Sequence, residues 1–505
     1  MQLARVIETS AAVAGTRSRT AKVAALAGAL RETPADEVAV VTDYLAGRLP
    51  QRTVGVGWRR LQTLPEPATD STLSARDVDT ALAALQRLAG TGSVATRGAA
   101  VAELFSRATR DEQHWLVGLI TGELRQGAGD GVMLKAIAEA ASVPESAVRR
   151  AVMLAGFAGP VAAAALGADG AEAAQEALAQ IQLEVGRPLR PMLAGSAAQV
   201  ADVVDGSATL AVETKVDGIR LQAHLRGGAV RLFTRTLEEV TERMPEVVEL
   251  LAALPAERAV LDGEVIALAP DGRPEPFQVT GARTASTADP AALREQVPLT
   301  TFLFDLLHLD GRDLVDEPAH QRWGALASLA PELLVSRMET DDAEAAHAFF
   351  AQQVVAGHEG VVIKSLDAPY AAGRRGAGWV KVKPRHTLDL VVLAVEWGSG
   401  RRRGWLSNIH LGARDATTGE LVMLGKTFKG MTDEMLAWQT ERFLELETHR
   451  EGHVVHVRPE QVVEIAYDGV QRSNRYPGGV ALRFARVLRY RDDKPVSEID
   501  PVPSP

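Results

Sequence analysis

The stretch ETKVDGIR, residues 213–220, places one lysine, Lys215, between an acidic residue and an Asp-Gly pair. The residues before it, TLAVETK from Thr209, alternate and are rich in small and β-branched side chains, which predicts a strand. Asp217-Gly218 is a turn dipeptide. Lys215 is therefore expected at the end of a strand, bordering whatever site the turn lines. These features make Lys215 the candidate for a covalent nucleophile.

A lysine nucleophile needs help, because an amine with a pKa of about 10.4 is neutral in only about 1 in 2,000 molecules at pH 7. Nearby cations lower such a pKa and so raise the neutral fraction. The candidate cations are Arg220, Lys364, Lys381 and Lys383. The pattern Lys-x-Asp-Gly alone is weak evidence, since it occurs by chance in a chain this long with a probability on the order of 0.1. A solvated lysine before a hairpin turn is the competing interpretation.

The composition limits the class of protein. The chain has 505 residues, and 46% of them are apolar, which suits packed cores. This length is enough for about three domains. The chain has no cysteine, which excludes disulfides, cysteine-ligated zinc and thiol nucleophiles. Its N-terminal sequence, MQLARVIETSAAVAG, lacks the apolar core of a signal peptide, and no apolar run is long enough to span a membrane. We therefore expect a cytoplasmic protein without membrane contact.

The charge is unevenly distributed. The formal net charge is −10, which disfavours a general polyanion binder. Between Gly373 and Arg403, however, eight basic residues stand against two acidic ones, Asp389 and Glu396. The basic residues are Arg374, Arg375, Lys381, Lys383, Arg385, Arg401, Arg402 and Arg403. A local basic surface of this kind can bind phosphates on an acidic protein, although a solvated loop would carry the same Arg-Arg-Arg run.

The hydrophobic periodicity changes twice along the chain. Residues 1–185 are rich in Ala and Leu with helical spacing, which predicts an all-α N-terminal domain. Within it, the stretch from Asp111 predicts a helix closed by Gly127. The prolines of GRPLRPMLAG, residues 186–195, interrupt this pattern. Residues 186–385 then predict an α+β domain of antiparallel sheets, and residues 386–505 a C-terminal OB-fold β-barrel.

Strand patterns support this division. In the middle domain they are RLFTRT (231–236), AVLDGEVIAL (259–268), TTFLFDLLHL (300–309), EGVVIKSL (359–366) and WVKVK (379–383). In the C-terminal domain they are LVVLAVEW, SNIHLGARD, LVMLGKTF, HVVHVRP, VVEIAYDG and LRFARVLRYR, with one helix near Glu434 to Leu446.

Charged residues interrupt the apolar strands of the middle domain. Burying a charge is costly, so such residues usually have a function. They are Glu264, Asp305, Glu359, Lys364, Lys381 and Lys383, although a capping or other structural role is open for Asp305 as well. Together they predict one charged cleft, whose mixed signs suit phosphoryl-type transfer: cations neutralise phosphate oxygens while carboxylates hold Mg²⁺. The glycine-rich Walker loop is absent, so the phosphates would be bound in another way.

In their order and spacing these motifs resemble those of ATP-dependent DNA ligases of the covalent nucleotidyltransferase superfamily. The resemblance implies that Lys215 of ETKVDGIR attacks the α-phosphorus of ATP and becomes adenylylated. It also implies that Glu213 recognises the edge of the adenine and that Arg220 contacts the nucleotide.

The resemblance assigns roles to the next motifs as well. FTRTLEEVTERMPEV supplies Arg235 as a ribose or phosphate contact, and LDGEVIA supplies Glu264 for the ribose and the metal ion. Phe304 of FLFDLLHLDG would stack on the base. EGVVIK supplies Glu359 as a ligand of Mg²⁺ and Lys364 as a nucleotide contact.

Two further motifs complete the set. In YAAGRRGAGWVKVKP, the resemblance makes Arg375, Lys381 and Lys383 hold the triphosphate and then the AMP. The last motif, LRFARVLRYRDDKP, would orient the pyrophosphate through Arg483, Arg486, Asp492, Asp493 and Lys494. Ala485 stands where proline is common in this motif, which changes a shape preference and not a reacting group. Structural roles are expected for His224, His308 and His410.

The resemblance extends to the helical segment. LVGLITGELRQGAGDGVMLKAIAEAA resembles the domain that grips duplex DNA in ligases of the bacterial type, and GRPLRPMLA resembles its exit into the catalytic core. It implies that the partner is nicked double-stranded DNA, that the protein is a monomer, and that it acts at the bacterial nucleoid in repair, replication or recombination. ATP and Mg²⁺ are the implied substrate and cofactor.

Other functions remain to be weighed at this point. An RNA ligase or an RNA-capping guanylyltransferase shares the chemistry, but the helical N-terminal domain disfavours both. An NAD-dependent DNA ligase carries a four-cysteine zinc module, which this chain lacks. A non-catalytic nick-binding protein would retain salt-dependent duplex binding without forming an adduct.

Overall fold

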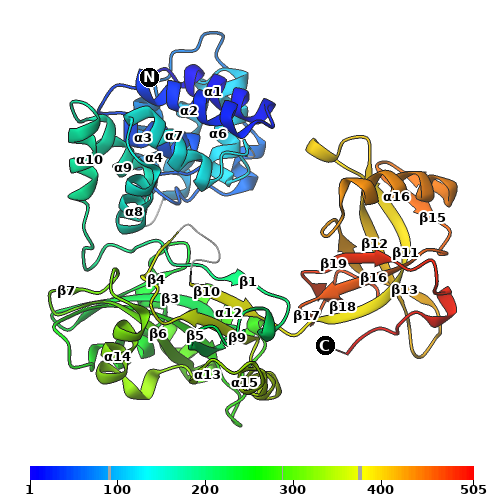
Figure 1. Cartoon of the computed structure of the whole chain (residues 1–505). Helices are drawn as coiled ribbons and strands as arrows, with labels where there is room; N and C mark the ends of the chain where they lie inside the picture. Colours follow the sequence, from blue (N-terminus) through cyan, green and yellow to red (C-terminus); the bar gives the residue numbers. More distant parts are fainter. Residues whose placement is uncertain (89–92, 125, 287, 373–377, 505) are drawn as a thin grey trace. The chain divides into compact units, whose positions relative to one another are not determined.

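A computed structural model of the chain describes residues 1–88, 93–124, 126–286, 288–372 and 378–504. The chain forms two compact units, one of Met1–Ser196 with Val203–Lys381 and one of Ala197–Asp202 with Val382–Pro505. The first unit contains a helical segment and an α+β segment, and the second is rich in strands (Figure 1). The order of fold classes predicted from the sequence is therefore confirmed. No helix within the described ranges is long and apolar enough to cross a membrane.

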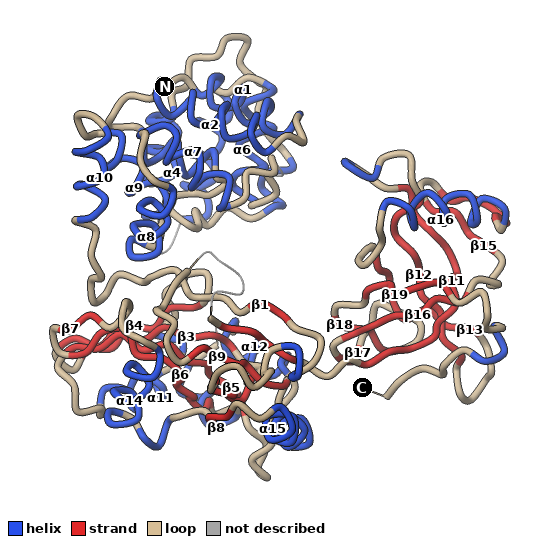
Figure 2. The backbone as a smooth tube through the Cα atoms, in the orientation of Figure 1, coloured by secondary structure: helices blue, strands red, loops and turns tan. Residues whose placement is uncertain are grey.

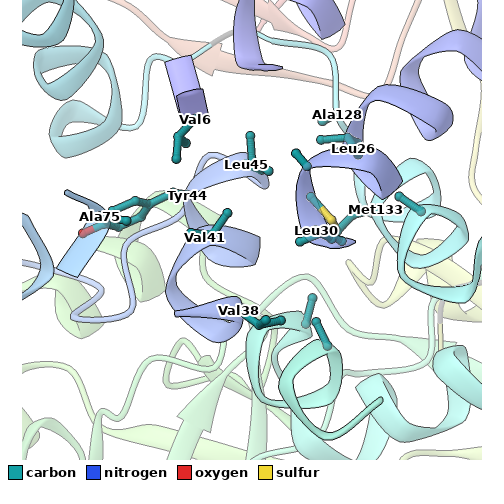
Figure 3. Packing of buried hydrophobic residues seen from close by; sticks show 14 of the residues in the cluster. Val6, Leu26, Leu30, Val38, Val41, Tyr44, Leu45, Ala75, Ala128 and Met133 are labelled. Atoms are coloured by element: carbon teal, nitrogen blue, oxygen red, sulfur yellow. The ribbon is translucent and has the colours of Figure 1, made fainter. Parts of the chain in front are cut away.

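The helical segment has one hydrophobic core. Its helices are α1 (Leu3–Gly15), α2 (Arg19–Glu32), α3 (Val38–Leu45), α4 (Ala75–Arg87), α5 (Ser93–Ser106), α6 (Arg110–Thr121), α7 (Asp130–Ala141), α8 (Glu145–Ala155), α9 (Ala158–Leu166) and α10 (Ala171–Ala179). Side chains of α1, α2 and α3, such as Val6, Leu30 and Leu45, are buried against one another (Figure 3). Apolar side chains at helical spacing along these segments build this core, as the sequence indicates.

Helix α6 ends earlier than its sequence suggests. It begins with a capping box, in which Thr109 and Glu112 bond to each other's backbone N–H groups. It ends at Thr121, because Gly122 adopts a left-handed conformation with φ 73° and donates its N–H to Gly118 and Leu119. The prediction that Gly127 closes this helix is wrong. Gly127 also has a positive φ, 70°, but it lies in the loop that follows.

The α+β segment contains two five-stranded sheets. The first has the order β1 (Gly195–Ser196), β10 (Trp379–Val382), β9 (Gly360–Ser365), β2 (Leu210–Lys215) and β8 (Arg337–Thr340). The second has the order β4 (Ala229–Thr234), β3 (Ile219–Arg226), β5 (Arg258–Ala267), β6 (Leu299–Leu309) and β7 (Arg312–Asp313). The helices are α11 (Pro245–Ala252), α12 (Phe277–Ala285), α13 (Pro290–Gln296), α14 (Ala319–Leu329) and α15 (Ala343–Val355). The second sheet is antiparallel throughout, whereas β1 pairs with β10 in parallel.

The turn between β2 and β3 carries the chain from the first sheet to the second. Strand β2 ends at Lys215 and β3 begins at Ile219. Gly218 packs so closely against β5 that a Cβ atom there would lie 2.2 Å from the carbonyl oxygen of Val265. Only glycine fits this approach, which explains the Asp-Gly pair after the lysine.

The second unit is built on a seven-stranded sheet (Figure 2). Its path is β13 (Leu421–Thr427), β12 (Leu406–Arg414), β11 (His386–Trp397), β15 (Val454–Val457) and β14 (Glu447–Glu451), and β16 (Val462–Tyr467) pairs with β11 and with β19 (Arg486–Tyr490). Strands β17 (Gly469–Arg472) and β18 (Val480–Arg483) form a separate pair, and α16 spans Asp433–Glu445. The sequence predicts LRFARVLRYR as one strand, but it is divided at Phe484, whose φ is 55°.

Candidate active site

Lys215 lies at the end of β2, as its sequence context predicts. Its neighbour across the sheet is the start of β9, where Glu359 donates its backbone N–H to the carbonyl oxygen of Lys215 at 3.0 Å. The Lys215 ammonium forms an ion pair with the Glu359 carboxylate. The two side chains are 21% and 14% exposed, so the pair borders solvent and is accessible to a ligand.

A second carboxylate comes from the other sheet. The Oε1 atom of Glu264, on β5, accepts the backbone N–H of Gly218 at 2.9 Å. Burial raises the pKa of Glu264 to about 7, while the ammonium of Lys215 acts to lower it. Lys215 is therefore influenced by two carboxylates, one from each sheet. Carboxylate oxygens are the donors that Mg²⁺ prefers, so Glu264 and Glu359 fit the magnesium ligands that the sequence implies.

Glu213 lies two residues before Lys215 and shares its face of β2. One carboxylate oxygen contacts the Nζ of Lys364 at 2.5 Å, and the other accepts from Arg337 at 2.9 Å. All three side chains are at least nine-tenths buried. The buried Glu213 carboxylate is thus neutralised by two cations and held in a fixed orientation.

Two aromatic rings, those of Phe304 and Trp379, lie next to Lys364, the partner of Glu213. The Nζ of Lys364 donates to the carbonyl oxygen of Phe304 at 3.1 Å and lies 4.2 Å from the ring centroid of Trp379. Phe304 and Trp379 meet edge to face with centroids 5.9 Å apart. The guanidinium of Arg220 lies 5.3 Å from the Phe304 ring. Phe304 is half-buried, so its ring can also contact a ligand.

Arg220 is part of a closed hydrogen-bonding network. It donates two hydrogen bonds to Asp262, at 2.9 and 2.6 Å, and one to the carbonyl oxygen of Met192 at 2.7 Å. The hydroxyl of Tyr370 donates to the same Asp262 at 2.6 Å and accepts the backbone N–H of Met192 at 3.0 Å. This network fixes the guanidinium beside the Phe304 ring.

The remaining predicted residues are dispersed. Arg235 is exposed in the turn after β4. Lys381 is half-buried on β10, opposite Ser196 of β1. Lys383 belongs to the second unit, where its Nζ lies 3.1 Å from the carboxylate of Asp468. Arg375, like Arg374, lies outside the described residues.

Asp305 does not belong to the cleft that its sequence pattern suggests. Its carboxylate accepts two hydrogen bonds from Arg322, at 2.7 and 2.9 Å, and both side chains are almost completely buried. Arg322 also donates to the carbonyl oxygens of Glu317 and Ala368. Of the two roles that the sequence leaves open for Asp305, a cleft residue or a structural acid, its pairing with the buried Arg322 supports the second.

In the last motif, the three residues at its end contact their own unit. The Nζ of Lys494 lies 2.8 Å from Asp389, and Asp493 pairs with Arg491 at 2.8 Å. Asp492 accepts from the side-chain amide of Gln461 at 2.8 Å. Of the two arginines, Arg483 ends β18 and Arg486 begins β19, one on each side of the Phe484 turn.

Sequence reasoning missed four residues that organise this site: Asp262, Arg337, Tyr370 and Trp379. Three of them stand inside stretches already singled out, LDGEVIA, YAAGRRGAGW and WVKVK. For these three residues the sequence offered one signal, a polar or aromatic residue close to a charged residue within the same motif. Arg337 carries no such signal, because its partner Glu213 lies 124 positions away.

The chain matches three family models. They are the ATP dependent DNA ligase domain over residues 191–383, the ATP dependent DNA ligase C terminal region over residues 402–494, and the DNA ligase N terminus over residues 60–138. The chain is also 60% identical to a probable DNA ligase of Beutenbergia cavernae, over 99% of this chain and 98% of that protein. A probable DNA ligase of a Nocardioides species is 60% identical over 99% of this chain and 97% of its own length.

The chain belongs to the ATP-dependent DNA ligases. It is an enzyme that uses ATP to seal nicks in DNA. The solved structure named Pmar-Lig_PreS3 is similar in fold, with a TM-score of 0.59 and 19% identity over 96% of this chain and 99% of that chain. In this ligase helices α4 to α6 and most of α7 fall within the match to the DNA ligase N terminus, and the strand-rich unit is the C-terminal OB region.

Proposed function

We propose that Lys215 is the residue of this ligase that carries AMP. The observation that supports this most directly is its position. Lys215 ends a strand at the junction of two sheets, paired with Glu359 and electrostatically coupled to Glu264. It is half-buried, whereas the neighbouring Lys364 is buried and already neutralises Glu213.

In the first step, Lys215 leaves its ion pair with Glu359 and loses a proton, since an ammonium has no lone pair with which to attack. Its Nζ then forms a bond to the α-phosphorus of ATP. The bond from that phosphorus to the bridging oxygen breaks, and pyrophosphate departs with the electron pair. The nitrogen then releases a second proton, which like the first passes to solvent, and the product is a lysyl-AMP phosphoramidate.

In the second step, an oxygen of the 5′-phosphate at the nick attacks the phosphorus of lysyl-AMP. The P–N bond breaks, and the lysine nitrogen recovers a proton. The DNA now carries a 5′-adenylate, which makes AMP a good leaving group. In the third step, the 3′-hydroxyl loses its proton to solvent and its oxygen bonds to the 5′-phosphorus. The bond from that phosphorus to the bridging oxygen breaks, AMP departs with the electron pair, and the phosphodiester is complete.

The nucleotide contacts are part of the same proposal. Glu213 would accept from the adenine edge through lone pairs that Arg337 and Lys364 leave available, since a carboxylate offers about four acceptor sites. Phe304 would stack on the base, with Arg220 beside it. The ribose and phosphate contacts would be Arg235, Glu264, Lys364, Arg375, Lys381 and Lys383.

Glu359 and Glu264 would hold Mg²⁺, which neutralises phosphate charge when it is bound. Both residues approach Lys215, and the raised pKa of Glu264, about 7, reflects burial of a carboxylate that a cation would compensate. The donor chemistry supports this part of the proposal.

Labelling with ATP carrying a radioactive α-phosphate tests the role of Lys215. In the presence of Mg²⁺, the wild-type protein should retain label after denaturing electrophoresis, and nicked DNA should discharge it. Lys215→Ala should take up no label. The matched control is Lys135→Ala, which removes an exposed lysine of α7 and should label normally. Undiminished labelling of Lys215→Ala would refute the assignment while leaving the ligase activity itself unquestioned.

Three further expectations belong to this proposal. The domains would span residues 1–185, 186–385 and 386–505, which the end of α10 at Ala179 and the start of the second unit at Val382 support. The protein would act as a monomer on nicked duplex DNA, and it would work in the cytoplasm at the nucleoid.

A further inference from the structure

A cluster of two histidines and one glutamate lies at the edge of the sheet in the second unit. Strands β14 and β15 are antiparallel, and His449 stands directly opposite His456 in their register. Their rings stack with centroids 4.2 Å apart and an interplanar angle of 4°. Glu451 lies two residues after His449, so all three side chains project from the same face.

The potential ligand atoms of these three residues already lie close together. The Oε1 atom of Glu451 lies 4.0 Å from the Nε2 of His449, and its Oε2 atom lies 3.8 Å from the Nε2 of His456. Two donors on one tetrahedral ion, each about 2.0–2.2 Å from it, are separated by roughly 3.4 Å. These two edges are about half an ångström longer than that separation, and all the ligand atoms lie within 4.8 Å of one another. The lone pair of an imidazole nitrogen lies in the ring plane, so the two stacked rings must also turn toward each other to share one ion.

The three side chains can make this adjustment. His449, Glu451 and His456 have side-chain exposures of 58%, 74% and 33%, so their rotamers are not fixed by packing. Water can reach the remaining coordination positions from the solvent side. The backbone that carries the ligands is fixed, because β14 and β15 are hydrogen-bonded to each other.

A fourth residue orients one of the imidazoles. The hydroxyl of Thr448 donates to the carbonyl oxygen of His456 at 3.1 Å. Its single proton is used there, so its oxygen accepts from the Nδ1 of His449, at 3.2 Å. The Nε2 of His449 then carries the lone pair that faces Glu451. A hydrogen bond to the second nitrogen of a histidine is the arrangement that usually supports a metal ligand.

We propose that His449, Glu451 and His456 bind a divalent transition metal ion of the zinc class. Two imidazole nitrogens and one carboxylate are a donor set that Zn²⁺ accepts, with the fourth position open to water. Mg²⁺ prefers oxygen donors in octahedral geometry and is a poor match. This site is thus chemically different from the pair of carboxylates near Lys215.

Occupation would have a structural effect. In the order of the sheet, β14 is the end strand beyond β15. An ion held by His449 and Glu451 from β14 and by His456 from β15 would cross-link the edge strand to its neighbour. Binding to the folded state alone raises the melting temperature of the unit that contains the site, by an amount that grows with metal concentration.

Calorimetric titration of the full-length protein, prepared without a polyhistidine tag, tests the proposal. The buffer would contain saturating Mg²⁺, and ZnCl₂ would be the titrant. We expect one equivalent to bind at the cluster and the melting temperature of the protein to rise with it. CoCl₂ should give the visible absorption bands of a low-symmetry, four- or five-coordinate ion.

Single substitutions identify the ligands. His449→Asn, Glu451→Gln and His456→Asn should each weaken zinc binding by more than about 10-fold, and Thr448→Val by about 10-fold, the size usual for loss of an orienting hydrogen bond. The matched control is His453→Asn. His453 is an exposed histidine in the turn between the two strands, and its Nε2 atom lies 4.0 Å from the carboxylate of Glu396.

Two results would overturn the proposal. One is wild-type binding that is unchanged in His449→Asn and His456→Asn, which would place the ion elsewhere. The other is an equal loss in His453→Asn, which would mean non-specific binding to exposed histidines. The substituted side chains are largely exposed, and circular dichroism of each variant would show that the fold is retained.

Discussion

Asp305 and Glu359 each interrupt an apolar strand pattern in the α+β segment, yet their carboxylates have different surroundings. Asp305 and its partner Arg322 have side-chain exposures of 4% and 1%, and two backbone carbonyls accept hydrogen bonds from the Nη1 atom of the arginine. Glu359 and Lys215 are 14% and 21% exposed. A charge paired within the core is not available to a ligand, and removing its partner destabilises the fold. A pair that borders solvent remains accessible to a ligand.

Breaking the buried pair of Asp305 and Arg322 should have the largest effect on the free energy of unfolding. Arg322→Leu leaves Asp305 as a buried carboxylate without its partner, which should lower the free energy of unfolding by about 3–5 kcal/mol. Urea denaturation measures this change. The control is Arg294→Leu, which removes an exposed pair with Glu249 and should cost less than about 1 kcal/mol. Equal losses in the two variants would contradict the assignment of Asp305 to the core.

The contrast between Asp305 and Glu359 shows what the sequence could predict. The strands that the sequence singled out, such as β5, β6 and β9, lie close to their patterns, because alternation and flanking turn residues define a strand locally. Strands β3 and β8 were not predicted. Asp305 lies inside β6 and Glu359 directly before β9, and in the sequence each is an acid beside apolar strand residues. Which cation each one meets depends on Arg322, 17 positions away, and on Lys215, 144 positions away. Local patterns carry no information about contacts at such separations.

The second unit shows a related limit. The sequence did not indicate β14, ETHRE, because it is an edge strand with four exposed residues and no apolar alternation. The division of LRFARVLRYR at Phe484 was also missed, since nothing about phenylalanine favours a positive φ. Both features depend on tertiary contacts.

Changing the solvent-bordering pair should affect chemistry more than stability. Glu359→Gln keeps the shape of the side chain but removes the carboxylate beside Lys215. The rate of self-adenylylation should fall about 10²-fold or more, as for loss of one electrostatic group at a reacting centre. The free energy of unfolding should change by less than about 1 kcal/mol, since the pair of Glu359 and Lys215 is partly exposed. Glu332→Gln, at an exposed site, should change neither property. A large loss of stability in Glu359→Gln would place this pair with the core charges.

His224 extends the comparison to a buried group that titrates. Its Nδ1 accepts the backbone N–H of Gly186 at 2.9 Å, so its Nε2 donates to Gln222 at 2.9 Å. Burial lowers the pKa of His224 from 6.5 to about 3. Below pH 6.5 the unfolded chain takes up a proton that the folded protein does not. This contribution to stability is therefore complete above pH 6.5 and decreases as the pH falls toward 3.

The decrease should amount to roughly 2 kcal/mol between pH 7.5 and pH 5. Urea denaturation of the wild type and of His224→Gln at both pH values isolates it, because other groups with shifted pKa values, such as Glu264, contribute equally in the two proteins. In His224→Gln, which cannot be protonated, stability should fall by about that much less over this range. His347→Gln changes an exposed histidine and should leave the wild-type pH dependence intact. An unaltered pH dependence in His224→Gln would mean that the ring can be protonated inside the folded protein.

Tyr370 belongs to both sides of this comparison. It is buried in the core, and its hydrogen-bonding network also contains Arg220, a proposed nucleotide contact. Tyr370→Phe removes the donor to Asp262 and leaves the buried N–H of Met192 without its acceptor. It also removes the hydroxyl that accepts from the Nη2 atom of Arg220 at 3.3 Å. The free energy of unfolding should fall by about 1–2 kcal/mol. Arg220 keeps two hydrogen bonds to Asp262 and one to Met192, so its guanidinium should stay in place. Self-adenylylation by the folded variant should then decrease less than about 10-fold, well below the loss expected for Glu359→Gln. A large loss of self-adenylylation at an unchanged free energy of unfolding would instead mean that the Tyr370 hydroxyl contacts the nucleotide. Burial alone would then fail to separate residues that stabilise the fold from residues that act on the substrate.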